Sequence, residues 1–159
     1  MKEYKVKGMA LHRGTNLPLV VLQEREGSKT LPIPVGSLEA SSILIELEGA
    51  TPPRPSAHDL MAHLFLRHRF KLTQVVISHL GEECSSALIY YRKGPKGYSI
   101  ESRPADAIAL AMRLSGPIFL TEEATLHVRS KLYADEVLEP NSPSYIYVEP
   151  NRQLLKMAY

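Results

Sequence analysis

The hydrophobic pattern of the chain is strongest over residues 105–114, where apolar side chains, many of them alanine, are interrupted only by Asp106 and Arg113. Pro104 suits the first turn of a helix because its missing N–H has no intrahelical partner there, and Asp106 places negative charge near the positive helix end. A helix that is apolar on nearly every side is normally buried. The pattern therefore predicts a central helix that begins at Pro104 and ends before the Gly-Pro step at 116–117, with only Asp106 and Arg113 touching water.

A second helix is expected from Ser37 to about Glu48, with Gly49 ending it. Its apolar and polar positions fall on different faces at the spacing of an α-helix. The apolar face comprises Ala40, Leu44 and Leu47, and the polar face comprises Glu39, Ser42 and Glu46. This segment is therefore predicted to be an amphipathic helix.

A third helix is expected from Ser56 to about His68, after a proline-rich loop at 51–55. Ser56 with Asp59 three residues later is a variant of the capping box. The expected core stripe is Leu60, Met61, Leu64 and Phe65, and the expected exposed line is Asp59, His63 and Arg67. A last helix is expected from Thr121 to about Leu132.

Segments rich in strand-forming residues lie between these helices. The expected strands are 4–11, 19–23, 31–35, 72–80, 85–91, 97–101 and 118–120. Segments 4–11 and 19–23 are expected to form a hairpin. Segment 31–35 carries two prolines and is expected at a sheet edge or a strand end. Segments 72–80, 85–91 and 97–101 are expected to form an antiparallel meander. Together the elements predict an α+β fold, in which a mostly antiparallel or mixed sheet packs with three to four helices.

Residues 1–138 are expected to form one compact domain, because a chain of 159 residues is long enough to bury a substantial core. The tail at 139–159 is rich in Pro, Asn and Ser and is expected to pack peripherally or across a partner subunit. Within it, Tyr145, Ile146, Tyr147 and Val148 have high strand propensity, which favours an added edge strand.

Composition excludes several classes of protein. The net charge of +2 is too small to indicate nucleic-acid or membrane binding by itself, so any nucleic-acid contact must be local. Cys84 is the single cysteine, which excludes an internal disulfide and a thiolate zinc cage. A lone cysteine fits a reducing cytoplasm. We expect Cys84 to be a packed strand residue. Neither a signal peptide nor a membrane-spanning stretch is expected.

Charged residues that suit phosphodiester chemistry gather at predicted helix starts and on the loops before them. These residues are Glu39, Arg54, His58, Asp59, Arg103 and Asp106. Carboxylates hold divalent cations, histidine moves protons, and guanidinium groups neutralise phosphate charge. The set therefore supplies the parts of a site that cleaves nucleic acid.

Each of these residues also has a structural interpretation. Asp59 and Asp106 stabilise the first turn of a helix even without a ligand. Arg103 can equally form an ion pair with Asp59 or Glu101 that locks two loops together. Tyrosines on the predicted strands suit either packing or base stacking. Small basic groups near strand ends, namely Arg67, Arg69, Lys71, Arg92, Lys93 and Lys96, suit either a solvated surface or the guidance of a polyanion.

Three ordered blocks of the chain resemble the bifunctional nuclease domain. They are Thr30-Leu31-Pro32-Ile33-Pro34-Val35-Gly36 with Glu39-Ala40, Pro52-Pro53-Arg54-Pro55-Ser56-Ala57-His58-Asp59-Leu60, and Glu101-Ser102-Arg103-Pro104-Ala105-Asp106-Ala107-Ile108-Ala109-Leu110-Ala111. The resemblance covers about residues 17–120. This chain departs from the family pattern at Pro34, Ala57, Glu101 and Ala105, so two hydroxyl groups of that pattern are missing. The resemblance implies a compact α+β fold and cleavage of both RNA and DNA.

Two hypotheses follow. In the first, the protein is a metal-assisted nuclease of low sequence specificity. Asp59 and Asp106, with Glu39 as a third carboxylate, hold Mg²⁺, Mn²⁺ or Ca²⁺. His58 is the general acid or base, and Arg54 and Arg103 bind phosphate. In the second, the protein is a non-catalytic binding or assembly module whose charged helix starts are structural. A homo-oligomer, most simply a dimer, is expected in either case.

Overall fold

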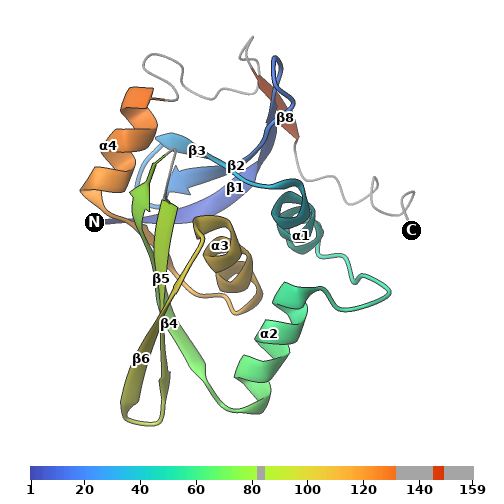
Figure 1. The fold of residues 1–159 in the computed structure, drawn as a ribbon, viewed down its shortest axis with the longest axis vertical. Helices are drawn as coiled ribbons and strands as arrows, with labels where there is room; N and C mark the ends of the chain where they lie inside the picture. The colour runs from blue at the N-terminus through green and yellow to red at the C-terminus, as the bar shows by residue number, and fades with distance from the viewer. Residues whose placement is uncertain (82–84, 132–144, 149–159) are drawn as a thin grey trace.

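Twelve helices and strands are described in the computed structural model of the protein, which covers residues 1–81, 85–131 and 145–148 (Figure 1). The strands are β1 (Lys2–His12), β2 (Pro18–Glu24), β3 (Thr30–Pro34), β4 (Lys71–Leu80), β5 (Ser85–Lys93), β6 (Lys96–Ser102), β7 (Ile118–Leu120) and β8 (Tyr145–Val148). The helices are α1 (Ser37–Leu47), α2 (Ala57–Arg67), α3 (Pro104–Arg113) and α4 (Glu122–Lys131). The α+β fold class is therefore confirmed.

One mixed sheet runs in the order β3-β2-β1-β7-β4-β5-β6. The short strand β7 joins its two halves, because it pairs antiparallel with β1 and parallel with β4. The predicted hairpin is β1–β2, and the predicted meander is β4–β5–β6. The proline-containing segment forms β3 at the edge of the sheet, as expected for a strand in which Pro32 and Pro34 have no backbone N–H to donate to a neighbour.

Helix α3 is buried as its apolar pattern predicts. Ala107, Ile108, Ala109, Leu110 and Ala111 are at most 1% exposed. Helices α1 and α2 both pack against α3, and α3 in turn contacts β4 and β5 (Figure 1). The start of α3 is thus held between the sheet and two other helix starts.

The predicted core stripe of α2 is wrong for three of its four members. Leu60, Met61 and Leu64 are 59%, 40% and 49% exposed, whereas Phe65 is buried, as is Ala62. The helix is rotated because its first turn carries polar side chains that bond to α1 and α3, and those bonds fix which face turns inward. An apolar stripe is left facing away from the core.

Two further expectations about exposure are corrected. Arg113, expected to reach water, has a side chain only 4% exposed. On α1, Ser42 of the predicted polar face is 5% exposed, beside Ile43, which the predicted apolar face omits and which is fully buried. Both polar residues lie inward because they bond to each other, as described below.

The predicted strand at the tail is confirmed as β8, which pairs antiparallel with β1 from Met9 to His12. The rest of the tail and Cys84 lie outside the described residues. Among the helices that the structure describes, none is long and apolar enough to cross a membrane.

Candidate active site

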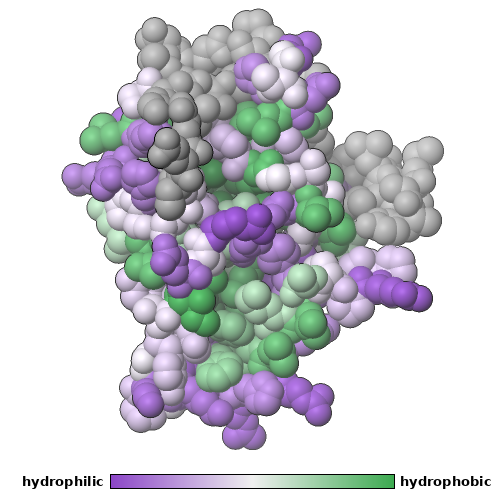
Figure 2. Space-filling model, in the orientation of Figure 1, coloured by the Kyte–Doolittle hydropathy of each residue, from purple (hydrophilic) through white to green (hydrophobic). Residues whose placement is uncertain are grey.

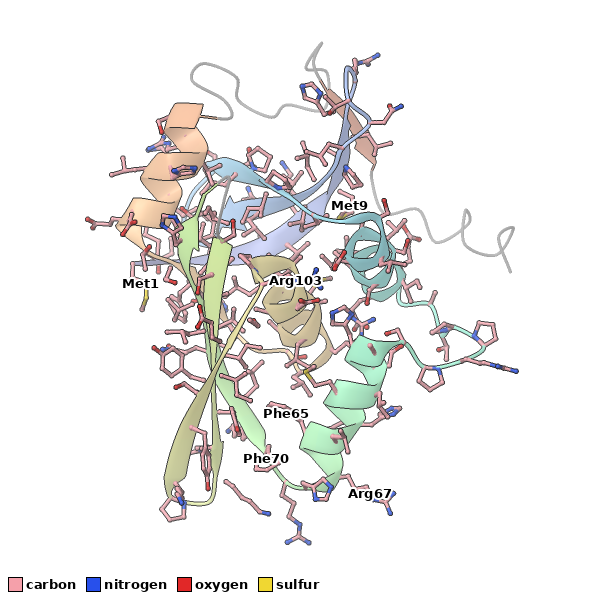
Figure 3. All side chains as sticks on the ribbon, viewed as in Figure 1. Met1, Met9, Phe65, Arg67, Phe70 and Arg103 are labelled. Atoms are coloured by element: carbon pink, nitrogen blue, oxygen red, sulfur yellow. The ribbon has the colours of Figure 1, made fainter. Side chains whose placement is uncertain are left out.

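Arg103, the N-cap residue of α3, lies at the centre of the candidate site (Figure 3). Its Nε donates to Asp106 Oδ2 at 2.7 Å, and its Nη2 lies 3.2 Å from Asp106 Oδ1 and 2.7 Å from Glu39 Oε1. Gly36 makes room for Glu39, since a Cβ at residue 36 would overlap the carboxylate. The Arg103 side chain is nevertheless 69% exposed, so the two carboxylates hold a guanidinium that solvent reaches.

His58 lies beneath this ion pair, and its side chain is 13% exposed. Its Nε2 is 3.0 Å from Asp106 Oδ1, and its Nδ1 is 2.9 Å from Ser42 Oγ. Ser42 Oγ also accepts a hydrogen bond from Arg113 Nη2 at 2.9 Å. The Ser42 hydroxyl donates to Nδ1 when only Nε2 carries a proton, and it accepts from Nδ1–H when both ring nitrogens are protonated; Nε2–H donates to Asp106 in both cases.

Asp59 has two structural roles. It completes a capping box with Ser56, whose backbone N–H donates to Asp59 Oδ2 at 2.7 Å. Its other oxygen, Oδ1, accepts from Arg113 Nε at 2.6 Å. Arg113 also donates to the carbonyls of Ser42 and Ala109, so its buried charge is hydrogen-bonded as well as paired.

Hydrogen bonds and neighbouring charges lower the pKa values of Asp59 and Asp106 and raise the pKa of Arg103. Burial raises the pKa of Asp59, but hydrogen bonds from Arg113 and Ser56 outweigh it and lower the pKa to about 2. Burial likewise raises the pKa of Asp106, and hydrogen bonds from Arg103 and His58 outweigh it, so its pKa lies below the ordinary value. The hydrogen bond with Asp106 raises the pKa of Arg103, assisted by the charge of Glu39. All three groups are therefore charged at neutral pH.

The structure brings most of the predicted site residues together. Glu39, His58, Arg103 and Asp106 are joined directly, and Asp59 is linked to His58 through Arg113 and Ser42. Arg54 is exposed on the loop before α2, with no hydrogen bond or ion pair to any described residue. The expected pairing of Arg103 with Asp59 or Glu101 is not formed; its partners are Asp106 and Glu39.

Ser42 and Arg113 belong to the cluster but were not among the predicted site residues. A signal for Arg113 exists in the sequence. It follows Asp106 by seven residues, which is two helical turns, so the only two charges of an otherwise apolar helix lie on one face. No comparable signal marks Ser42, whose role depends on which helix packs beside it.

The carboxylates predicted to bind a metal have other partners. Asp106 and Glu39 are bonded to Arg103, and Asp59 is bonded to Arg113. Within residues 1–81, 85–131 and 145–148, no three His, Cys, Asp or Glu side chains are grouped so that they could hold a metal ion. These carboxylates, held by Arg103 and Arg113, are therefore not arranged to bind a divalent cation.

Adding about 1 mM Mg²⁺, Mn²⁺ or Ca²⁺ without substrate is expected to raise the melting temperature by less than about 1 °C, because a cation must first displace Arg103 or Arg113 from a carboxylate. Scanning calorimetry measures this, with NaCl at matched ionic strength as the control. A rise of several degrees that Asp106→Asn abolishes would show that these carboxylates do bind the cation.

Arg103 brings the cluster to the surface of the molecule, because its side chain is 69% exposed. Figure 2 shows a hydrophilic patch at the centre of one face, where Figure 3 labels Arg103, with a hydrophobic strip beside it. A hollow of about 200 Å³ lies elsewhere, between α4 and the strands β1 and β3, and none of the candidate residues lines it. A ligand can therefore reach Arg103 from solvent.

Comparison with known proteins gives one family and two relatives. The model of a family described as the bifunctional nuclease domain matches residues 20–131. Two proteins from two strains of Mycobacterium tuberculosis, both described as uncharacterized, are each 35% identical over 136 residues, which is 86% of this chain and 80% of the relative. The matched family region contains every residue of the cluster.

Proposed function

Because the chain belongs to the bifunctional nuclease domain family, we propose that it hydrolyses phosphodiester bonds of RNA or DNA at the cluster of Arg103, Asp106 and His58. One observation carries the assignment to these residues. Arg103 is 69% exposed, and within the described part of the chain its contacts use Nε and Nη2, leaving both N–H groups of Nη1 for a ligand.

Arg103 is suited to bind the phosphate of the bond that is cleaved. A guanidinium presents planar donors that match phosphate oxygens, and here two carboxylates fix its plane before the substrate arrives. Glu39 and Asp106 are positioning residues in this proposal. An orientation set in advance lowers the cost of aligning the phosphate.

His58 is assigned the proton transfer. Its Nε2 edge lies beside Asp106, next to the exposed guanidinium, whereas its Nδ1 edge is bonded to buried Ser42. Water adds to phosphorus and releases a proton to solvent, while His58 in its protonated form gives a proton from Nε2 to the leaving oxygen as the P–O bond breaks. Asp106 stabilises that imidazolium, and catalytic hydrogen bonds commonly reach their final geometry only in the complex.

A second candidate function, homo-oligomeric assembly without catalysis, is supported by a different observation. Leu60, Met61 and Leu64 form an exposed apolar stripe on α2, and Leu38 of the neighbouring helix α1 is 85% exposed. Exposed apolar patches of this kind commonly mark contacts between subunits. In this case the cluster would serve only to fix the three helix starts.

Replacing His58 with asparagine is expected to lower the rate of cleavage of a fluorogenic single-stranded oligonucleotide by about 100-fold or more, because the variant keeps a polar side chain but cannot transfer the proton. Initial rates on RNA and DNA substrates, in buffers with a divalent ion and with a chelator, measure the effect. Circular dichroism checks that the variant is folded.

The matched control is His63→Asn, which changes an exposed histidine on the same helix and is expected to leave the rate unchanged. Equal rates for the two variants would contradict the role of His58. If wild-type protein cleaves nothing in either buffer while cluster variants lose stability, the assembly function is favoured over the nuclease.

A further inference from the structure

A second surface lies at the end of the molecule formed by the β5–β6 hairpin and the connection from α2 to β4. We call it the hairpin end, and its six cations are Arg67, Arg69, Lys71, Arg92, Lys93 and Lys96. All six are exposed, and none forms an ion pair with a described residue. The strand register places Lys71 opposite Arg92 and Lys93 opposite Lys96, so the two segments bring their charges to the same end.

The charge at the hairpin end is not balanced locally. Residues 60–81 and 85–100 contain no Asp or Glu. Because the whole chain carries a net charge of +2 and these six side chains carry +6, the rest of the chain carries −4. Like charges held together repel each other, so a concentration of this kind favours an anionic ligand over a purely structural role.

Aromatic rings lie among these cations. Tyr98 stacks on Tyr91 with ring centroids 5.3 Å apart and planes at 18°, and Phe70 meets Tyr91 edge-on at 5.4 Å. The ammonium groups of Lys93 and Lys96 lie over the rings of Phe70 and Tyr98. Alternating basic and aromatic groups match the alternating phosphates and bases of a nucleic acid.

The outermost ring, Tyr98, lies on the edge strand β6, where solvent and the exposed Lys96 side chain reach it. Tyr98 is 37% exposed and Ile100, two residues along on the same face of the strand, is 50% exposed. A base can stack on such a ring only when it is free of its own duplex neighbours. The geometry therefore favours a single strand over a duplex.

We propose that the hairpin end binds single-stranded nucleic acid, with the six cations on the phosphates and Tyr98 stacked on a base. In the view of Figure 3, Phe65 and Phe70 are labelled between Arg103 and the end that bears Arg67, and Figure 2 shows a hydrophobic strip below the central hydrophilic patch. The choice of nucleic acid as ligand rests on the proposed function, although binding does not require cleavage.

The test is the affinity of the full chain for a fluorescein-labelled phosphorothioate oligo(dT) of about 20 nucleotides, a probe that resists cleavage. Lys93→Gln with Lys96→Gln is expected to raise Kd about tenfold and to lower the slope of log Kd against log salt by about 1.4, since each cation contributes about 0.7 on a single strand. Tyr98→Leu keeps the apolar bulk but removes the stacking face, and is expected to raise Kd about fivefold with the slope unchanged.

The matched control is Arg13→Gln with Lys29→Gln, which removes the same charge from exposed turns in the β1–β2–β3 half of the sheet and is expected to leave Kd unchanged. Equal losses in both double variants, or none in either, would overturn the proposal. The proposal would also be overturned if Lys93 and Lys96 bound the protein to anionic phosphatidylserine vesicles while the oligonucleotide did not bind. A protein that binds the probe through this surface and cleaves nothing contradicts the nuclease proposal alone.

Discussion

Replacing Arg103 with alanine is expected to lower kcat/KM for cleavage of a single-stranded oligonucleotide by about 100-fold or more, because the change removes the donors that face the phosphate. Arg103→Lys is expected to recover only part of that loss, since an ammonium carries the charge but cannot hold Asp106 and Glu39 and present donors to phosphate in one fixed plane. Steady-state kinetics on one labelled oligonucleotide measure both variants.

The stability of the Arg103 variants separates binding from folding. The side chain is 69% exposed, so its loss removes little packing, although Glu39 and Asp106 lose their cationic partner. Arg13→Ala, which removes a cation from the turn after β1, is the control and is expected to retain full activity. If Arg103→Lys is as active as wild type, the planar guanidinium is not required for binding the phosphate.

Replacing Arg113 with methionine is expected to lower the free energy of unfolding by about 3 kcal/mol, because breaking a buried ion pair leaves its partner charged and unpaired. The Arg113 side chain is 4% exposed and links α3 to Asp59 of α2 and to Ser42 of α1. Urea denaturation measures the change. Arg67→Met, at an exposed position of α2, is expected to change stability by less than about 0.5 kcal/mol.

Two further measurements identify the cause of this loss. Adding Asp59→Asn to Arg113→Met is expected to recover part of the stability, since the second change removes the orphaned charge. The pKa of Asp59 is about 2 in the folded protein, below its ordinary value of 3.8. Because the folded-state pKa is depressed, the stabilisation is complete above pH 3.8 and is lost as the pH falls toward 2, and the difference between wild type and variant should shrink over that range. An unchanged difference there would contradict the ion-pair explanation.

The helix starts were predictable because the chemistry that makes them is local. Pro104 with Asp106, and Ser56 with Asp59, satisfy the free N–H groups of a first helical turn wherever that helix packs. The candidate site lies at helix starts, so five of its members could be named from the sequence: Glu39, His58, Asp59, Arg103 and Asp106. Their mutual contacts could not be, because they join three helices far apart in the chain.

The sequence by itself determined the order and type of the elements, from the alternation of β1 and β2 to the apolar run of α3. Only the tertiary structure decided how each helix is rotated about its axis. Helical periodicity fixes the angle between Leu60 and Phe65, but not which of their faces turns inward. That choice was made by partners from elsewhere in the chain: Arg113 and Asp106 hold the polar first turn of α2 against α3, and Leu60 is left in solvent.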